Sequence, residues 1–110
     1  MGRFVKGDVV VVPFPFSDLA LAKRRPALVV AELVGNDRIL CQITSQHFRD
    51  NYAIGINDVD FEEGSLKRAS NVRPNRLFTA DSRIILYRAG HLKSERVGDV
   101  VQIIIDILNR

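Results

Sequence analysis

Residues 7–16 read GDVVVVPFPF, and this stretch decides how the chain begins its fold. Four consecutive valines, Val9 to Val12, are typical of a strand buried in a sheet. The prolines that follow lack the amide proton that a ladder of hydrogen bonds needs, so we expect the strand to end in the segment Pro13-Phe14-Pro15-Phe16. Residues 17–25 then form a polar, basic loop.

Two further strands are predicted over residues 27–31 and 38–44, which are rich in apolar side chains. Between them, Gly35-Asn36-Asp37 contains residue types that tolerate positive φ angles and favour a turn. Residues 27–44 are therefore expected to form a β-hairpin.

One end of this hairpin brings an arginine close to a hydroxyl group. In an antiparallel pair the first residue of one strand faces the last of the other, so a register near Ala27 opposite Ile43 places Arg25 and Thr44 within side-chain reach. A guanidinium and a hydroxyl can bind phosphate and stabilise a phosphorane-like transition state. The alternative, a solvated Arg25 and a Thr44 that only fills a strand end, stays open.

The second half of the chain predicts short strands and one helix. We expect strands at residues 52–56, 70–72, 77–79 and 84–87, with an acidic loop at 57–64. Apolar residues from Val97 to Leu108 recur at steps of three and four, which favours a helix with Ser94 as its N-cap. Several strands followed by one helix predict a mainly β, α+β fold, a small and strongly curved β-barrel with a C-terminal α-helix packed on it.

The composition fits one small folded domain over residues 1–110. Hydrophobic residues make up 46% of the chain and charged residues 26%, which argues against disorder. No apolar run approaches the ~20 residues of a membrane span, and the first residues contain no apolar signal core. The single cysteine, Cys41, fits a reducing compartment and lies in a predicted strand, where a small buried side chain is expected. We therefore expect a cytoplasmic protein.

Basic residues are concentrated in two segments. Residues 67–88 contain six Lys or Arg and one Asp, and Lys23-Arg24-Arg25 adds three positive charges in a row. If these segments share a face they attract phosphates, although solvated loops are the plainer explanation. One cysteine and two distant histidines, His47 and His91, cannot provide the spacing of a zinc site, and no glycine loop for nucleotide phosphates is present. We expect neither a metal nor a cofactor.

Several blocks of the sequence resemble the MazF/PemK family of toxins. The first runs from Gly7 to Asp18 and continues with KRRPALVV at residues 23–30: a strand, a proline–phenylalanine turn, a basic loop and a second strand. Gln42-Ile43-Thr44-Ser45 is similar to the next family block, and SNVRPNRLFT at residues 70–79 to the one after it. Residues 92–108 resemble the family's C-terminal helix, so the resemblance covers nearly the whole chain.

This resemblance implies the toxin of a type II toxin–antitoxin pair with an SH3-like small β-barrel. Members of the family form homodimers, bind a cognate antitoxin protein and cut single-stranded RNA, such as mRNA, at short motifs without a metal. The ribose 2′-hydroxyl attacks the adjacent phosphorus and leaves a 2′,3′-cyclic phosphate. The expected partners are thus single-stranded RNA, a second copy of the chain and an antitoxin with an extended acidic segment.

The family's site residues map onto this chain through the matching blocks. Arg25 falls in the place of a general acid or charge stabiliser, and Thr44, with Ser45, in that of the group that holds the scissile phosphate. The further RNA-binding candidates are Phe16, Lys23, Arg24, Arg73, Asn75 and Arg76. Many relatives carry an aspartate where this chain has Asn75, which cannot take a proton at neutral pH. The general base is therefore open, with His47 as a candidate.

Two other functions stay open from the sequence. Gyrase-poisoning toxins share the fold and bind a protein target, but they do not need Arg25 paired with Thr44. A nucleic-acid-binding barrel that has lost catalysis is the other, because of Asn75. Phe16 is a candidate stacking face for an unpaired base, whereas Phe78 lies in a predicted strand and is assigned to the core.

Overall fold

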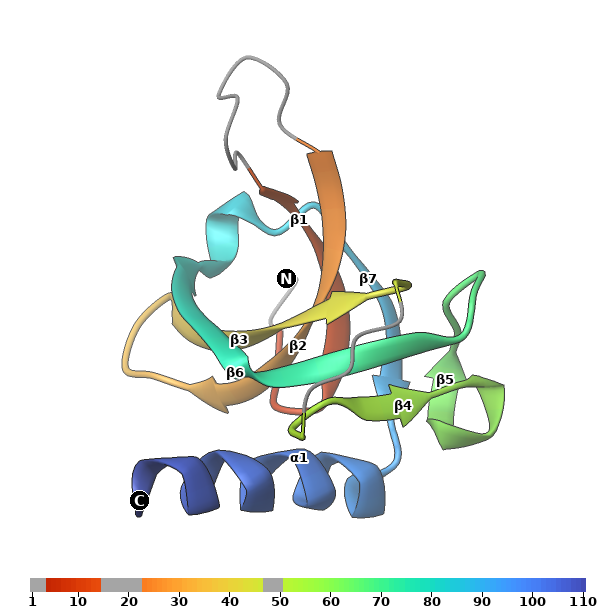
Figure 1. Cartoon of the computed structure of the whole chain (residues 1–110). Coiled ribbons are helices and arrows are strands. Elements are labelled where there is room, and N and C mark those ends of the chain that lie inside the picture. The colour runs from red at the N-terminus through yellow and green to blue at the C-terminus, as the bar shows by residue number, and fades with distance from the viewer. Residues whose placement is uncertain (1–3, 15–22, 47–50) are drawn as a thin grey trace.

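The computed structural model describes residues 4–14, 23–46 and 51–110. These form seven strands, two 3-10 helices and one α-helix (Figure 1). The strands are β1 (Asp8–Phe14), β2 (Lys23–Glu32), β3 (Asp37–Thr44), β4 (Ile54–Ile56), β5 (Phe61–Gly64), β6 (Ser70–Asp81) and β7 (Tyr87–Leu92). The helices are η2 (Asp58–Asp60), η3 (Ser82–Ile84) and α1 (Ser94–Leu108).

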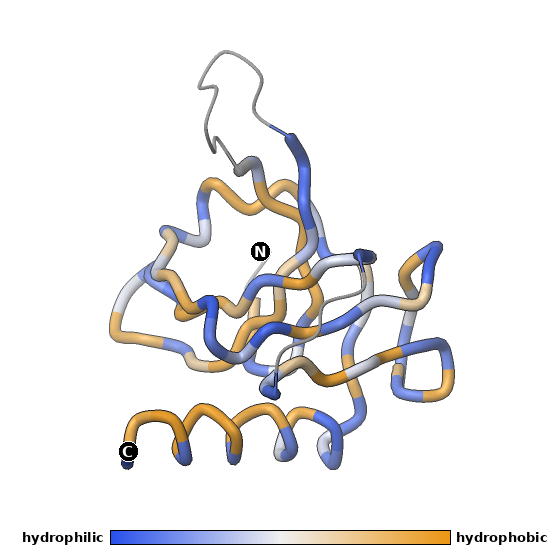
Figure 2. Tube along the Cα trace, viewed as in Figure 1, coloured by the Kyte–Doolittle hydropathy of each residue, from blue (hydrophilic) through white to orange (hydrophobic). Residues whose placement is uncertain are grey.

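All strands belong to one curled sheet in which every pair is antiparallel, in the order β4-β6-β3-β2-β1-β7-β5. Helix α1 lies across one face of this sheet (Figure 1). Figure 2 shows that the apolar side of α1 is turned toward the sheet and its polar side away from it. The predicted class, a mainly β fold with a C-terminal helix, is confirmed.

Two apolar clusters, one on each face of the sheet, explain the run of valines. Val9 packs with Leu28, Val97 and Val100 in the cluster beneath α1. The neighbouring Val10 packs with residues of the second cluster, on the other face. Successive side chains of a strand point to opposite faces, so a strand covered on both sides needs apolar residues at every position.

The Gly7-Asp8 step anchors the start of β1. Gly7 has φ of +99°, and a Cβ there would lie 2.8 Å from Cε1 of His91, so a side chain is excluded by both backbone and neighbour. Its amide donates to the carbonyl of Val29 at 2.8 Å, and its carbonyl accepts from the amide of Leu92 at 2.9 Å. The glycine therefore joins β1 to two other strands.

Strand β1 ends within the predicted proline–phenylalanine segment, whereas β2 begins earlier than the sequence suggested. β1 continues through Pro13 to Phe14, and β2 begins at Lys23 instead of residue 27, with Val11 paired to Pro26. Residues 23–26 pair with β1 alone, so the other side of β2 is an edge there. A proline is tolerated at an edge because its missing amide proton costs no ladder bond.

The second half also differs from the prediction in its boundaries. The strands expected at residues 70–72 and 77–79 are one long strand, β6, with an irregularity opposite Gln42 that absorbs residues 73–76. Such a bulge adds residues on one strand without a partner, and it accommodates Pro74. The expected strand at 84–87 is instead η3 followed by β7, and the acidic loop contains η2 and β5.

Helix α1 begins at Ser94 with Lys93 as its N-cap, so the predicted cap was one residue too late. Lys93 makes no capping hydrogen bond through its side chain. Val97 and Val100 are buried, but Leu108, at the far end of the predicted apolar face, is 73% exposed. Within the described ranges, no helix is long and apolar enough to cross a membrane.

Candidate functional site

The register of the central hairpin brings Arg25 and Thr44 together. Ala27 pairs with Gln42 and Leu28 with Cys41, one residue away from the register that the sequence suggested. The pairing of β2 with β3 stops at Ala27, and beyond it Arg25 and Thr44 lie at the same end of the two strands, where both line one hollow. On the other side of β2, Arg25 pairs with Val12 of β1.

Both residues line a hollow of about 670 Å³ at this end of the sheet, called the basic hollow below. Its cations are Arg24, Arg25, Lys67, Arg68 and Arg88, and its hydroxyl groups belong to Thr44, Ser45, Ser65, Ser70 and Tyr87. No Asp or Glu among the described residues lines it. Five cations with hydroxyl donors and no lining carboxylate create a positive potential that suits phosphate groups.

A short turn fixes the hydroxyl of Thr44. The residue is 5% exposed, and its Oγ1 accepts the amide of Gln46 at 3.1 Å. The carbonyl of Gln46 in turn accepts Nδ2 of Asn71 at 3.2 Å, and Asn71 is the strand partner of Thr44 on β6. With its oxygen engaged by the turn, the Thr44 hydroxyl retains its hydrogen as a donor for a ligand.

Arg88 is held in the basic hollow by two carboxylates. Its guanidinium binds Oε1 of Glu63 at 2.8 Å and lies 3.6 Å from Oδ1 of Asp8. These carboxylates raise the pKa of Arg88 above its usual value, the hydrogen bond to Glu63 being the larger cause. Asp8 is itself buried and also lies 2.8 Å from Nδ1 of His91.

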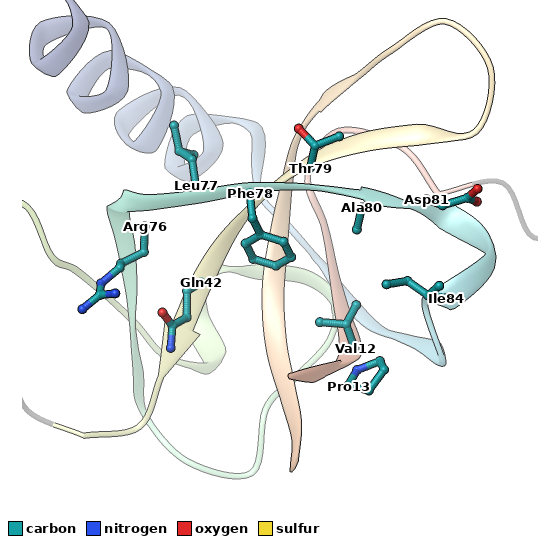
Figure 3. Close-up of a pocket in the computed structure, with 10 residues that line it drawn as sticks. All are labelled: Val12, Pro13, Gln42, Arg76, Leu77, Phe78, Thr79, Ala80, Asp81 and Ile84. Atoms are coloured by element: carbon teal, nitrogen blue, oxygen red, sulfur yellow. The ribbon is translucent and has the colours of Figure 1, made fainter. Parts of the chain in front are cut away.

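A second hollow, of about 510 Å³, is lined by residues of β1, β3, β6 and η3 (Figure 3). We call it the apolar hollow. Its lining includes Val12, the strand partner of Arg25, and Gln42, two residues before Thr44 on β3. Arg25 and Thr44 therefore lie between the two hollows.

The predicted site residues are only partly brought together. Arg24, Arg25, Thr44 and Ser45 line the basic hollow, and Arg76 lines the apolar hollow. Lys23 and Asn75 are exposed on β2 and β6 but line neither hollow. Arg73 is 9% exposed and also lies outside both linings. Phe16 and His47 fall outside the described residues.

Two supporting residues were missed by the sequence reasoning. Asn71 holds the turn that presents Thr44, and Ser70 donates through Oγ to the carbonyl of Arg68 at 2.9 Å, which fixes another wall of the basic hollow. Both lie in the block of residues 70–79 that resembles the family, but their roles were not predicted because both act through backbone groups that the sequence does not place. Their position directly before the Arg73-Pro74 step was the one available signal.

Other reactive groups are arranged for structure. Burial raises the pKa of the Cys41 thiol to about 12, and the thiol donates to the carbonyl of Arg73 at 2.9 Å, as expected of a small buried side chain. The guanidinium of Arg83 lowers the pKa of Asp81 to about 2, so this carboxylate is a weak base. Within the described part of the chain, no group of three or more His, Cys, Asp or Glu could hold a metal ion.

The protein has a curled antiparallel sheet, one C-terminal helix and a basic, hydroxyl-lined hollow at the strand ends. This combination defines a class of small proteins suited to phosphate-bearing ligands. Residues 5–108 match the family model described as PemK-like, MazF-like toxin of type II toxin–antitoxin system. The chain therefore belongs to this toxin family. No curated protein matches the sequence at a significant level.

Solved structures share the fold at low sequence identity. MazF from Deinococcus radiodurans is 17% identical, with 100% of both chains covered and a TM-score of 0.79. An endoribonuclease in complex with its cognate antitoxin, from Mycobacterial species, is 11% identical over 97% of this chain and 96% of that chain, with a TM-score of 0.77. The Mycobacterium tuberculosis toxin MazF-mt6 is 14% identical over 93% and 96%, with a TM-score of 0.72.

Proposed function

We propose that this toxin is a metal-independent endoribonuclease that cuts single-stranded RNA, with mRNA as its target. The observation that carries the proposal is that Arg25 and Thr44 both line the basic hollow. Structural neighbours described as endoribonucleases support it. The two residues that the family resemblance assigned to catalysis thus lie in a hollow whose cations attract phosphate groups.

The reaction moves two protons and exchanges one bond at phosphorus. The ribose 2′-oxygen loses its proton and bonds to phosphorus, while the bond from phosphorus to the 5′-oxygen breaks and that oxygen gains a proton. The products are a 2′,3′-cyclic phosphate and a 5′-hydroxyl. Arg25 stabilises the extra negative charge and donates to the leaving oxygen, and the Thr44 hydroxyl orients the phosphate.

The group that removes the 2′-proton is not a carboxylate of the basic hollow. No described Asp or Glu lines that hollow, Asn75 cannot accept a proton, and Asp81 is paired with Arg83. His47 remains the candidate from the sequence, three residues after Thr44. If it acts as base, cleavage rises with pH through about 6.5, and His47→Gln removes this dependence.

The partners proposed for this chain are a cognate antitoxin and a second copy of itself. Neighbouring structures include MazE–MazF of Deinococcus radiodurans. An extended acidic antitoxin segment has the charge to cover the basic hollow and exclude RNA. Light scattering at micromolar concentration should give the mass of a dimer, and a crystal of the complex with Arg25 fully exposed would contradict this mode of inhibition.

A cleavage assay tests the enzymatic proposal. Wild-type protein, Arg25→Ala and Arg110→Ala are each incubated with a long unstructured RNA in EDTA, and the fragment ends are mapped. Arg110 lies at the C-terminus, over the ring of Tyr52, and serves as a matched arginine control. We expect discrete fragments with 2′,3′-cyclic phosphate ends from the wild type and the control, and a loss of about a hundredfold or more in Arg25→Ala.

Two results would count against the proposal. Cleavage that survives undiminished in Arg25→Ala would mean a contaminant or a site elsewhere. Intact RNA across sequences that cover most short motifs would instead favour a toxin that inhibits without cleaving, or a binder that has lost catalysis.

A further inference from the structure

The apolar hollow has a mostly apolar lining that includes one aromatic side chain and several polar ones. Phe78 and Gln42 point into it from β6 and β3, and Val12 and Ile84 close it from below (Figure 3). Arg76 lies at the same end as Gln42 (Figure 3). Phe78 is half-buried and packs on the second apolar cluster, so its ring is held in place by the fold.

Two polar side chains in this lining have no structural task within the described residues. The amide of Gln42 makes no side-chain hydrogen bond there, and the guanidinium of Arg76 makes neither a hydrogen bond nor an ion pair. A glutamine amide presents a donor and an acceptor side by side, which matches the edge of a nucleobase. An apolar hollow with an aromatic wall and such an amide suits an unpaired base better than an aliphatic side chain.

The hollow also lies near the proposed cleavage site, because two of its lining residues are strand neighbours of Arg25 and Thr44. Val12 pairs with Arg25, and Gln42 lies two residues before Thr44 on the same strand. Residues two apart on a strand point to the same face and lie about 7 Å apart, close to the spacing of successive nucleotides in an extended strand. A phosphate at Arg25 and Thr44 therefore sets a neighbouring base at the mouth of the hollow.

We propose that the apolar hollow binds one unpaired nucleobase of the RNA beside the scissile phosphate, and that Gln42 reads the edge of that base. This inference rests on the proposed ribonuclease function. The base packs against Phe78, the Gln42 amide forms hydrogen bonds to its edge, and Arg76 binds an adjacent phosphate. Gln42 is then a residue that determines the sequence specificity of the toxin.

The test measures base preference in two ways, with and without cleavage. Wild type, Gln42→Ala and the matched control Gln102→Ala, whose amide binds Asp106 on α1, are compared on an RNA library of random sequence. The same proteins then select ligands from a random pool of 2′-fluoro RNA, which has no 2′-hydroxyl and cannot be cut. We expect Gln42→Ala to lose about tenfold discrimination at one position of the motif in both readouts, and Gln102→Ala to keep it.

Further variants separate the roles of the lining. Phe78→Leu keeps the apolar bulk and should weaken pool binding several-fold without changing which base is preferred, because stacking is tolerant of base identity. Gln42→Glu removes the donor and should change the preferred base. Thermal melting of each variant shows that it remains folded.

The outcomes distinguish this inference from the proposed function. If wild type selects a base in the uncleavable pool but cuts no RNA, the ribonuclease proposal fails and the base site stands. If wild type cuts RNA and Gln42→Ala keeps the same preference in both readouts, the base site is overturned and the ribonuclease proposal stands. A Gln42→Ala effect on antitoxin binding alone would also overturn it, in favour of a protein side chain as occupant.

Discussion

At the scale of single residues, the hydroxyl of Thr44 holds a turn and, in the proposed mechanism, also binds the phosphate. Its oxygen accepts the Gln46 amide, and its hydrogen is available to a phosphate. Thr44→Val keeps the shape and loses both, so we expect cleavage to fall by roughly a hundredfold or more and stability by about 1 kcal/mol. Thr44→Ser should restore most of the single-turnover rate. A valine variant that cuts RNA at the wild-type rate would exclude this role.

Cys41 offers a prediction on pH because burial raises its pKa to about 12. In an unfolded chain a thiol has a pKa of about 8.5, so at pH 8 the unfolded form holds a substantial thiolate fraction and the native form almost none. Iodoacetamide should label Cys41 in urea at least a hundredfold faster than in native buffer, as measured by mass spectrometry. The folded state holds the thiol proton more tightly than the unfolded state does. The contribution of Cys41 to the free energy of unfolding is therefore fully present below about pH 8.5 and falls as the pH rises above that value. Equal labelling rates would contradict the burial.

The sequence predicted Arg25 and Thr44 as a pair because both lie at ends of strands whose pairing follows from one turn. It did not predict Asn71 or Ser70, which act through backbone carbonyls, nor that Arg73 would be almost buried. A basic residue after a strand is expected in solvent, yet here Arg73 lies in the bulge of β6, where its carbonyl accepts the Cys41 thiol. Bulges depend on pairing between distant strands, and local propensity does not place them.

At the scale of elements, the junction of β1 and β7 depends on Asp8. Its buried carboxylate accepts the Val5 amide at 2.9 Å and faces both His91 and Arg88. Asp8→Asn removes the charge that Arg88 meets and replaces the carboxylate that His91 and the Val5 amide contact, and we expect it to lower the free energy of unfolding by about 2 kcal/mol, measured by urea denaturation. Asp99→Asn, in an exposed ion pair with Arg96, should cost less than about 1 kcal/mol. Equal costs would mean that Asp8 is not structural.

Element boundaries were harder to predict than element types. The apolar period of residues 97–108 predicted helix α1, and the run of valines predicted strand β1, because each pattern shows which side chains are buried. The predicted start of β2 was wrong because the proline rule assumes a strand paired on both sides, whereas residues 23–26 pair on one side only. Strand β7 was missed since Tyr87-Arg88-Ala89-Gly90-His91 has little apolar alternation and is fixed by pairing with β1 and β5.

At the scale of the whole molecule, a net charge of +3 understates the field at the strand ends. Five cations gather in one hollow whose described lining contains no acid, because Asp8 and Glu63 are engaged with Arg88 at its border. The acids of residues 50–63 are concentrated in a different segment. Under the proposed function, this separation of charge directs RNA and an acidic antitoxin segment to the same hollow, so we expect inhibition and substrate binding to compete.

The salt dependence of RNA binding measures this field directly. For single strands, the slope of log affinity against log salt is about −0.7 for each phosphate neutralised. With an uncleavable 2′-fluoro RNA and fluorescence anisotropy, Arg68→Ala should make the slope shallower by about 0.7 and weaken binding to all sequences alike, since a phosphate contact carries no base information. Arg68 is exposed and meets Ser70 only through its carbonyl, which the substitution retains, so the fold is unaffected.

Arg110→Ala, which lowers the net charge equally but outside the hollow, should leave the slope unchanged. If both variants shift the slope to the same extent, net charge alone governs binding and the hollow is not where RNA lies.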